Sequence, residues 1–372
     1  MRHLLLVLAS CLSLSVAAES TISGDLPRRD NRELESIPGL DSHYDVLRTA
    51  DCARLRTLMT RPAGTTGKLP AILFVQWLSC DSIELPESQK DGWSRMLRRL
   101  AQDSGMVLMR TEKAGVGDSE GESCASLDYE IELGHHRAAL EALRRSEFVD
   151  PERIFIFGAS MGGNMAPLVA AGEQIAGVMI WGGGARSWFE RTLGFERRAK
   201  EMSGLPAAVL DAYMRSLTRF LVAYLLDRKD PATIAREQPA LADVWGRIVG
   251  TEGNSQYGRP LAFHQQAAAQ DWAGAWERVD APVLVLHGGY DWFEEAAAHR
   301  LVADIANRRG AERGEFLEIA GTDHHFERFT DAKAAFRGEG GVINSDVAVN
   351  AMLHWLRERA LPVVASRSAR SN

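Results

Sequence analysis

Residues 153–165 read RIFIFGASMGGNM, and this stretch carries the strongest structural signal in the chain. A strand-like apolar run, Arg153–Phe157, leads directly into Gly158-Ala159-Ser160-Met161-Gly162, and a helical stretch follows. A serine on so sharp a turn has a strained backbone, and glycines two residues to either side relieve crowding against the strand and the helix. We therefore predict that Ser160 is a nucleophile. A glycine-rich turn that only packs helix against sheet is the alternative.

The segments around this turn alternate between strand and helix patterns. Strands are expected at residues 44–61 (two strands with a turn near 50–52), 71–76, 106–110, 153–157, 175–181, 282–286 and 316–319, and helices at 93–103, 128–145, 165–171, 296–307 and 346–359. Continuous apolar strands that alternate with amphipathic helices are typical of the α/β class, with a mostly parallel sheet covered on both faces. Roughly ninety residues, 185–279, show helical periodicity and no clear strand, which predicts an inserted helical cap.

The cap segment (residues 185–279) is rich in aromatic side chains. It contains Trp188, Phe189, Tyr213, Phe220, Tyr224, Trp245, Trp272 and Trp276. Aromatic residues this dense could line an apolar pocket, or they could form the core of the cap itself. We expect more than half of them to form that core.

The N-terminal residues match a cleaved export signal. Arg2 precedes an apolar run at 4–16, and small residues at 16–18 suit cleavage before Glu19. We predict a signal peptide over 1–18 and a secreted or periplasmic protein. A lipid anchor on Cys11 is less favoured, because it would leave too short an apolar stretch for export. The other expected divisions are core residues 19–184, the cap segment at 185–279, core residues 280–361 and a disordered tail at 362–372.

Composition narrows the range of partners. The chain has 372 residues, 45% of them hydrophobic, and a formal net charge of −7. Nucleic-acid binding is not expected, because affinity for phosphates depends largely on clustered Lys and Arg. After the signal peptide no apolar run approaches the ~20 residues that span a bilayer, so no membrane partner is expected either.

A serine hydroxyl is a poor nucleophile at neutral pH unless a histidine accepts its proton and a carboxylate orients that histidine. Asp291 follows the expected strand 282–286 and therefore lies at the carboxyl edge of the sheet, where Ser160 also lies. We predict Asp291 as the carboxylate. Glu294 and Glu295 are alternatives, but they resemble the first turn of the next helix, where acidic side chains commonly complement the helix dipole.

The histidine is expected in the polar loop at residues 321–326, GTDHHF, which follows the last strand. The loop offers two neighbouring histidines, and both satisfy the chain order Ser, Asp, His. We predict His324 as the base and keep His325 as the alternative.

Attack on a carbonyl creates an oxyanion that needs two N–H donors. One should be the backbone N–H of Met161, directly after the nucleophile. The other should come from the loop after the expected strand 71–76, where Trp77 and Leu78 are both candidates. The choice between these two residues stays open.

Three motifs together resemble the α/β-hydrolase superfamily: the turn at 158–162, Gly-Gly-Tyr-Asp at 288–291, and Asp-His at 323–324. The resemblance covers roughly residues 44–360 and implies a serine hydrolase that uses no metal or organic cofactor. We expect a carboxylic ester as substrate. The loop 112–121, EKAGVGDSEG, resembles serine aminopeptidase-like and acyl-peptidase-like members, so a short peptide or amide is the alternative substrate. A non-catalytic binding protein on the same fold is the second alternative.

The same resemblance implies a disulfide. In that fold the loops after residues 76 and 113 are neighbours above the active site, which could bring Cys80 and Cys124 together. We predict that they are bonded, and two free thiols are the alternative. Cys52 would then be left unpaired in the mature protein. The oligomeric state stays open.

Overall fold

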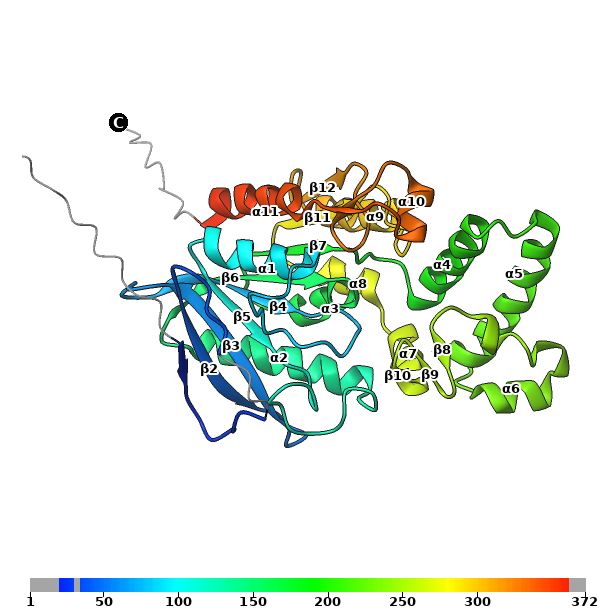
Figure 1. Cartoon of the computed structure of the whole chain (residues 1–372), viewed down its shortest axis with the longest axis horizontal. Helices are drawn as coiled ribbons and strands as arrows, with labels where there is room; N and C mark the ends of the chain where they lie inside the picture. Colours follow the sequence, from blue (N-terminus) through cyan, green and yellow to red (C-terminus); the bar gives the residue numbers. More distant parts are fainter. Residues whose placement is uncertain (1–19, 30–33, 361–372) are drawn as a thin grey trace, which may run out of the picture.

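A nine-stranded sheet forms the centre of the molecule, of which the computed structural model describes residues 20–29 and 34–360 (Figure 1). The predicted signal peptide (1–18) and the predicted disordered tail (362–372) lie outside the described residues. In spatial order the strands are β1 (Ser20–Ile22), β2 (Leu40–Arg48), β3 (Arg54–Pro62), β5 (Val107–Thr111), β4 (Leu69–Val75), β6 (Val149–Ala159), β7 (Gly177–Trp181), β11 (Val283–Gly288) and β12 (Gly314–Ile319).

The sheet is mostly parallel, as predicted. Strands β2 and β3 form an antiparallel hairpin, and β3 pairs antiparallel with β5. From β5 to β12 every neighbouring pair is parallel. All five residues of β5 and all five of β7 are buried, which explains why these strands are continuously apolar rather than alternating.

Helices cover both faces of the sheet and divide the core into two layers. Helices α1 (Gly92–Asp103) and α11 (Ser345–Ala360) contribute to one layer, and they pack against each other. Helices α2 (Tyr129–Arg145), α3 (Met161–Ala170), α8 (Trp272–Arg278) and α9 (Ala296–Asn307) contribute to the other. Side chains of one strand alternate between the layers: Leu73 belongs to the second and Phe74 to the first. The α/β fold class is therefore confirmed.

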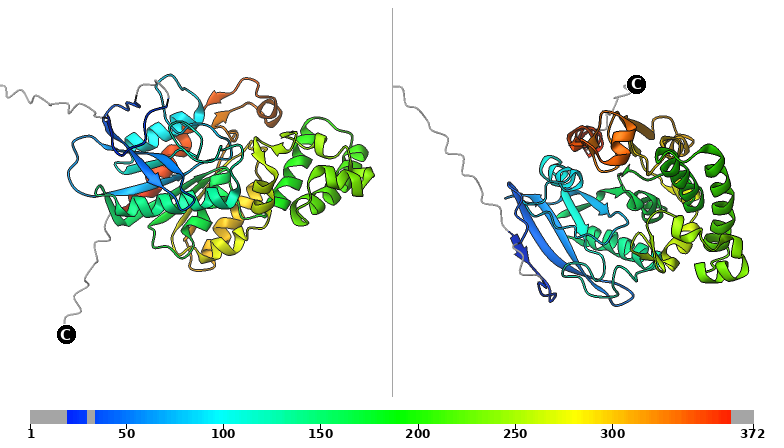
Figure 2. Two further views of the ribbon diagram at one scale, coloured as in Figure 1. Left: turned by 90° about the horizontal axis from the view of Figure 1, so that it is seen from below. Right: turned by 45° about the vertical axis from the view of Figure 1, so that its right-hand side comes forward.

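Most of the cap segment stands together at one end of the molecule, apart from the sheet (Figures 1 and 2). It contains α4 (Trp188–Met202), α5 (Ala207–Leu221), a π-helix (Val222–Leu226), α6 (Pro231–Glu237), two 3₁₀ turns (Pro239–Leu241 and Trp245–Arg247) and α7 (Leu261–Ala268). Three two-residue strands also occur: β8 (Thr251–Glu252), β9 (Ser255–Gln256) and β10 (Arg259–Pro260). The expectation of no strand here was wrong, because pieces this short leave no alternating pattern. Helix α8, the last of the segment, packs on α3 and α9.

A second departure from the expected pattern follows β12. The chain forms β13 (Glu327–Arg328), α10 (Ala332–Arg337) and β14 (Val342–Ile343) before α11 begins. Strands β13 and β14 pair antiparallel and close a small hairpin that returns the chain to α11. Within the described ranges no helix is both long and apolar enough to cross a membrane.

Candidate active site

Ser160 occupies the turn between β6 and α3, in a backbone conformation with φ 55° and ψ −121°. Positive φ is uncommon for a residue with a side chain, so the surroundings must hold it in place. Its N–H donates to the carbonyl of Trp181 at 2.7 Å. A Cβ on Gly162 would lie 2.0 Å from the carbonyl oxygen of Val75, and one on Gly158 would lie 2.4 Å from that of Gly162. Both glycines are therefore required for the strand and helix to approach each other this closely.

His324 lies in the loop between β12 and β13, with its Nε2 3.0 Å from Ser160 Oγ. Its backbone carbonyl accepts a hydrogen bond of 3.0 Å from the indole nitrogen of Trp181. The imidazole packs between aromatic rings, with centroid distances of 5.8 Å to Trp93 and 5.0 Å to Phe293. The loop and its ring contacts together fix the orientation of the imidazole.

Asp291 completes a continuous chain of hydrogen bonds, because its Oδ2 lies 2.7 Å from His324 Nδ1. Its other oxygen accepts from the backbone N–H groups of Phe293 (2.9 Å) and Glu294 (3.0 Å). Both carboxylate oxygens are therefore occupied, and the side chain can point in one direction only. The three residues come from the carboxyl ends of β6, β11 and β12.

The alternatives named from the sequence have other partners. Glu294 pairs with Arg191 at 2.7 Å, and Glu295 pairs with Arg186 and Arg198. The His325 side chain is 52% exposed and lies 3.5 Å from an oxygen of Asp323. Of the three carboxylates and two histidines considered from the sequence, Asp291 and His324 are the ones that the fold brings to Ser160.

Burial and charge act in opposition on this pair. Burial lowers the pKa of His324, but the charge of Asp291 and the hydrogen bond to it outweigh burial and leave the pKa raised above its ordinary value. Burial raises the pKa of Asp291, but His324 outweighs this and holds that pKa well below its usual range. The arrangement therefore favours an ionised Asp291 and stabilises a proton on the imidazole.

Neither a family model nor a curated protein matches the chain. Among solved structures, Est1E from Butyrivibrio proteoclasticus with ferulic acid bound is 15% identical, with a TM-score of 0.53 over 85% of this chain and 98% of that one. DcsB in complex with a substrate analogue is 18% identical, with a TM-score of 0.53 over 86% and 99%. The esterase PF2001 from Pyrococcus furiosus is 10% identical, with a TM-score of 0.53 over 93% and 99%. The chain has the α/β-hydrolase fold.

The candidate oxyanion donors come from the start of α3 and from the loop after β4. Met161 is the first residue of α3, and its N–H is one of the four that a helix leaves without an internal partner. Trp77 and Leu78 follow β4 and line the same cavity as Ser160. Both stay candidates for the second N–H donor.

A cavity of about 510 Å³ opens over Ser160 and His324. Apolar side chains of the core, among them Leu85, Trp93 and Phe293, form part of its wall, and Arg191 and Tyr257 from the cap segment complete it. None of the eight aromatic residues named from the sequence is among the described residues that line it. Six of the eight are buried: Trp188, Tyr213, Phe220, Tyr224, Trp272 and Trp276. The aromatic side chains of the wall are instead Trp77, Trp93 and Phe293 from the core and Tyr257 from the cap segment.

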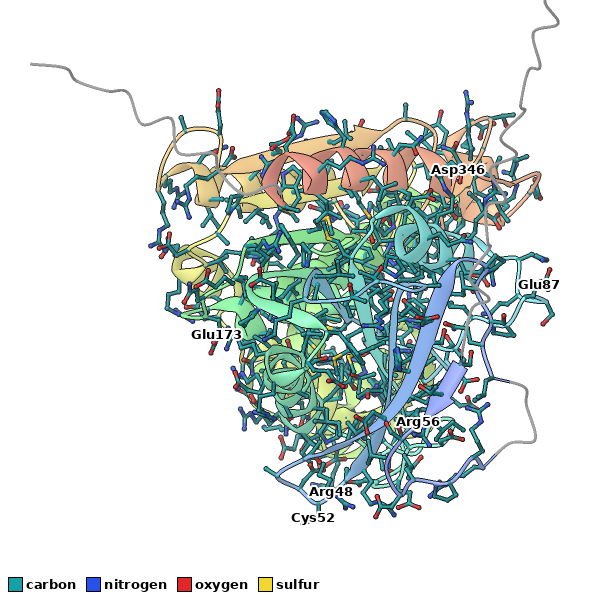
Figure 3. The ribbon with its side chains drawn as sticks, turned by 90° about the vertical axis from the view of Figure 1, so that its left-hand side faces the viewer. Arg48, Cys52, Arg56, Glu87, Glu173 and Asp346 are labelled. Atoms are coloured by element: carbon teal, nitrogen blue, oxygen red, sulfur yellow. A yellow bond between two sulfur atoms is a disulfide. The ribbon has the colours of Figure 1, made fainter. Side chains whose placement is uncertain are left out.

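Cys80 and Cys124 form the predicted disulfide, with 5.8 Å between their Cα atoms. The bond joins the loop after β4 to the loop between β5 and α2. Cys52 is free and exposed, and it lies at the turn between β2 and β3 (Figure 3). The unpaired thiol is therefore not among the residues of the cavity.

Proposed function

We propose that the chain is a secreted serine hydrolase that cleaves carboxylic esters, with Ser160 as nucleophile, His324 as base and Asp291 as the orienting carboxylate. The observation that carries this proposal is the unbroken hydrogen-bond chain from Ser160 Oγ through the His324 imidazole to Asp291. Ser160 and His324 both open into a cavity of about 510 Å³, which is within the usual size of a small-molecule site.

The reaction follows from this geometry in two halves. Ser160 Oγ attacks the ester carbonyl carbon while His324 Nε2 accepts the hydroxyl proton, and the carbonyl electrons move onto oxygen. That oxygen receives hydrogen bonds from the N–H of Met161 and from Trp77 or Leu78. The intermediate collapses, the C–O bond to the alcohol breaks, and His324 returns the proton to the leaving oxygen. Water then repeats the sequence on the acyl-enzyme and releases the acid.

The preference for an ester rests on two supports. One of the fold neighbours, from Pyrococcus furiosus, is an esterase, and another was solved with ferulic acid, a carboxylic acid, bound. Hydrolysis of an ester also makes the lesser demand on the site, because an alcohol is a better leaving group than an amine. Export is supported by the Cys80–Cys124 disulfide and by the signal-like residues 1–18. N-terminal sequencing of the exported protein should begin at Glu19.

Labelling with a fluorophosphonate probe tests the nucleophile. The wild type should be labelled, Ser160→Ala should not, and Ser94→Ala should label as the wild type does, because Ser94 lines the same cavity but is bonded to Asp91 instead. A folded wild type that resists the probe would overturn the proposal. A panel of chromogenic esters beside aminoacyl anilides tests the substrate class, and faster cleavage of the anilides would favour a peptidase.

A further inference from the structure

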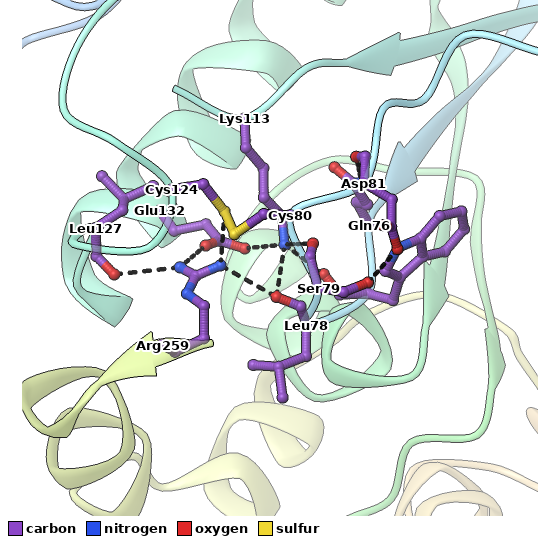
Figure 4. The surroundings of a disulfide bond; sticks show 11 residues. Gln76, Leu78, Ser79, Cys80, Asp81, Lys113, Cys124, Leu127, Glu132 and Arg259 are labelled. Carbon is purple, nitrogen blue, oxygen red and sulfur yellow. Dashed lines mark hydrogen bonds and ion pairs between the residues drawn. A yellow bond between two sulfur atoms is a disulfide. The ribbon is translucent and has the colours of Figure 1, made fainter. Parts of the chain in front are cut away.

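The side chain of Lys113 is buried beneath the loop that runs from Trp77 to Cys80 (Figure 4). Its ammonium group donates to three successive backbone carbonyls, those of Trp77 (2.5 Å), Leu78 (3.1 Å) and Ser79 (2.9 Å). Lys113 is 2% exposed. A lysine amine has three protons to donate, and here they converge on one turn of one loop.

A buried carboxylate and a second cation complete the cluster. Glu132 Oε1 lies 3.2 Å from Lys113 Nζ, and its other oxygen is bonded to Arg259. Arg259 comes from β10 in the cap segment, and it also donates to the carbonyl of Leu78 at 3.1 Å. The guanidinium and carboxylate are likewise buried, at 0% and 1% exposure. The loop from Trp77 to Cys80 is thus held by the core and by the cap segment together.

Such a cluster is costly to build, because an ammonium group removed from water must recover its lost hydration through polar partners. Burial lowers the pKa of Lys113 to about 8, with Glu132 opposing that shift. Lys113 is also the cation beside Glu132 Oε1, the oxygen that Arg259 does not bind. Arg259 binds one carbonyl of the loop, that of Leu78. The carbonyls of Trp77 and Ser79 are bonded to Lys113 and not to Arg259.

The direction of these carbonyls determines the direction of the N–H groups. In a planar trans peptide the C=O and the following N–H point in opposite directions. Three carbonyls gathered on Lys113 therefore turn the N–H groups of Leu78, Ser79 and Cys80 away from it. Of the two candidate oxyanion donors, Leu78 is the one whose N–H shares a peptide plane with a carbonyl bound to Lys113, that of Trp77. The N–H of Trp77 shares its plane with the carbonyl of Gln76 instead. Both residues line the cavity with Ser160.

We infer that Lys113 is a positioning residue for the oxyanion site: it holds the carbonyl of Trp77 so that the N–H of Leu78 faces the substrate oxygen. Arg259, which binds the carbonyl of Leu78, links this loop to the cap segment. The inference rests on the proposed hydrolase function. Lys113 itself touches neither the substrate nor Ser160, and its effect passes through the backbone of the loop.

The test compares Lys113→Met with Arg56→Met. Arg56, on β3, is a fully buried cation that donates to the carbonyls of Leu26 and Asp45 and pairs with Asp118, none of which belongs to the loop from Trp77 to Cys80 (Figure 3). Both variants lose a buried cation with carbonyl and carboxylate partners. Only Lys113→Met should lower kcat on the best ester, by about 10²-fold, with KM within about threefold, because an oxyanion contact acts mainly in the transition state.

Amide hydrogen exchange supplies a second readout that needs no turnover. A peptide covering residues 76–81 should lose protection in Lys113→Met and keep it in Arg56→Met. Equal losses of kcat in the two variants, or unchanged exchange in Lys113→Met, would overturn the inference. If the wild type neither cleaves esters nor reacts with fluorophosphonate, the proposed function fails instead, while the exchange data still decide whether Lys113 holds the loop.

Arg259→Lys is the milder variant if Lys113→Met does not fold. It keeps a positive charge for Glu132 but shortens the side chain that reaches the Leu78 carbonyl. Because Lys113 still holds the loop, kcat should fall by about tenfold at most, again with little change in KM. A loss confined to KM would contradict a positioning role and point to a contact with the substrate.

Discussion

Ser160 and His324 face Trp77, Leu78 and Ser79 across one cavity, but the two sides are held in place differently. We call Ser160, His324 and Asp291 the nucleophile side, and the loop from Trp77 to Cys80 the loop side. Ser160 directly follows β6, and Asp291 lies three positions beyond the end of β11. The backbone N–H groups of Phe293 and Glu294, two and three positions further along, orient Asp291. The loop opposite is held by Lys113, 36 positions from Trp77, by Arg259, 181 positions from Leu78, and by a disulfide that spans 44 positions.

The comparison shows which residues of the site are held in place by the end of a strand and which are not. Ser160 lies between β6 and α3, and Asp291 is bonded to N–H groups two and three positions further along, so strand ends and neighbouring backbone hold both residues. A longer irregular loop has no such constraint, and its backbone groups need partners from elsewhere in the chain. In this protein those partners are buried charges and a covalent bond. We therefore expect substitutions of the residues on the nucleophile side to impair the enzyme directly. The loop side should be impaired by substitutions at residues that are distant in sequence.

Removal of the base should have the largest effect and tests the nucleophile side. His324→Ala should reduce kcat/KM on esters by about 10⁴-fold or more, because Ser160 would lose its proton acceptor. His325→Ala is the matched control: its ring is half exposed and is not hydrogen-bonded to Ser160, so kcat should stay within about threefold, although His325 also lines the cavity. Steady-state kinetics on one chromogenic ester measure both. A loss of similar size in His325→Ala would contradict the assignment of His324.

Loss of the disulfide tests the loop side. Replacing both Cys80 and Cys124 with serine should lower the free energy of unfolding by about 3–4 kcal/mol, since the bond closes a loop of 44 residues. Chemical denaturation measures this effect. Cys52→Ser should change stability by less than about 0.5 kcal/mol, because that thiol is exposed and free. A double variant as stable as the wild type would show that Lys113 and Arg259 hold the loop without the bond.

The same difference explains how much could be predicted from the sequence. Ser160 and the strands around it could be predicted because apolar runs, glycines and turns are local signals. Asp291 and His324 could be predicted because each follows a strand, and parallel strands end at one edge of the sheet. The contacts of Lys113 with the loop could not be predicted, since they depend on residues 77, 113 and 259 meeting in space. The pairing of Cys80 with Cys124 was predicted only through the resemblance to a known fold, and strands as short as β8–β10 leave no pattern.

The substitution Gly162→Ala tests the close approach between α3 and the end of β4, where the loop begins. The Cβ of Gly162→Ala would lie 2.0 Å from the carbonyl oxygen of Val75 and 2.6 Å from that of Gln76, at the start of the loop. We expect a loss of about 2–3 kcal/mol in the free energy of unfolding, because backbone cannot move aside easily. Gly134→Ala, in α2, meets nothing within 4 Å and should stabilise by up to about 1 kcal/mol. Thermal and chemical denaturation compare the two, and a stable Gly162→Ala variant would contradict this close approach.

The smallest expected effect is a shift in pH dependence produced by the ion pair beside the base. His324 must be neutral to accept a proton, so kcat/KM should rise with pH through a midpoint above the ordinary histidine pKa of 6.5. Glu294 raises the pKa of His324 and Arg191 lowers it. Glu294→Gln should therefore lower that pKa and move the acidic limb to lower pH. Arg191→Gln should raise the pKa and move the limb to higher pH. Profiles of kcat/KM with a neutral ester measure both, and shifts of the same sign would mean that at least one of these charges does not act on His324 as expected.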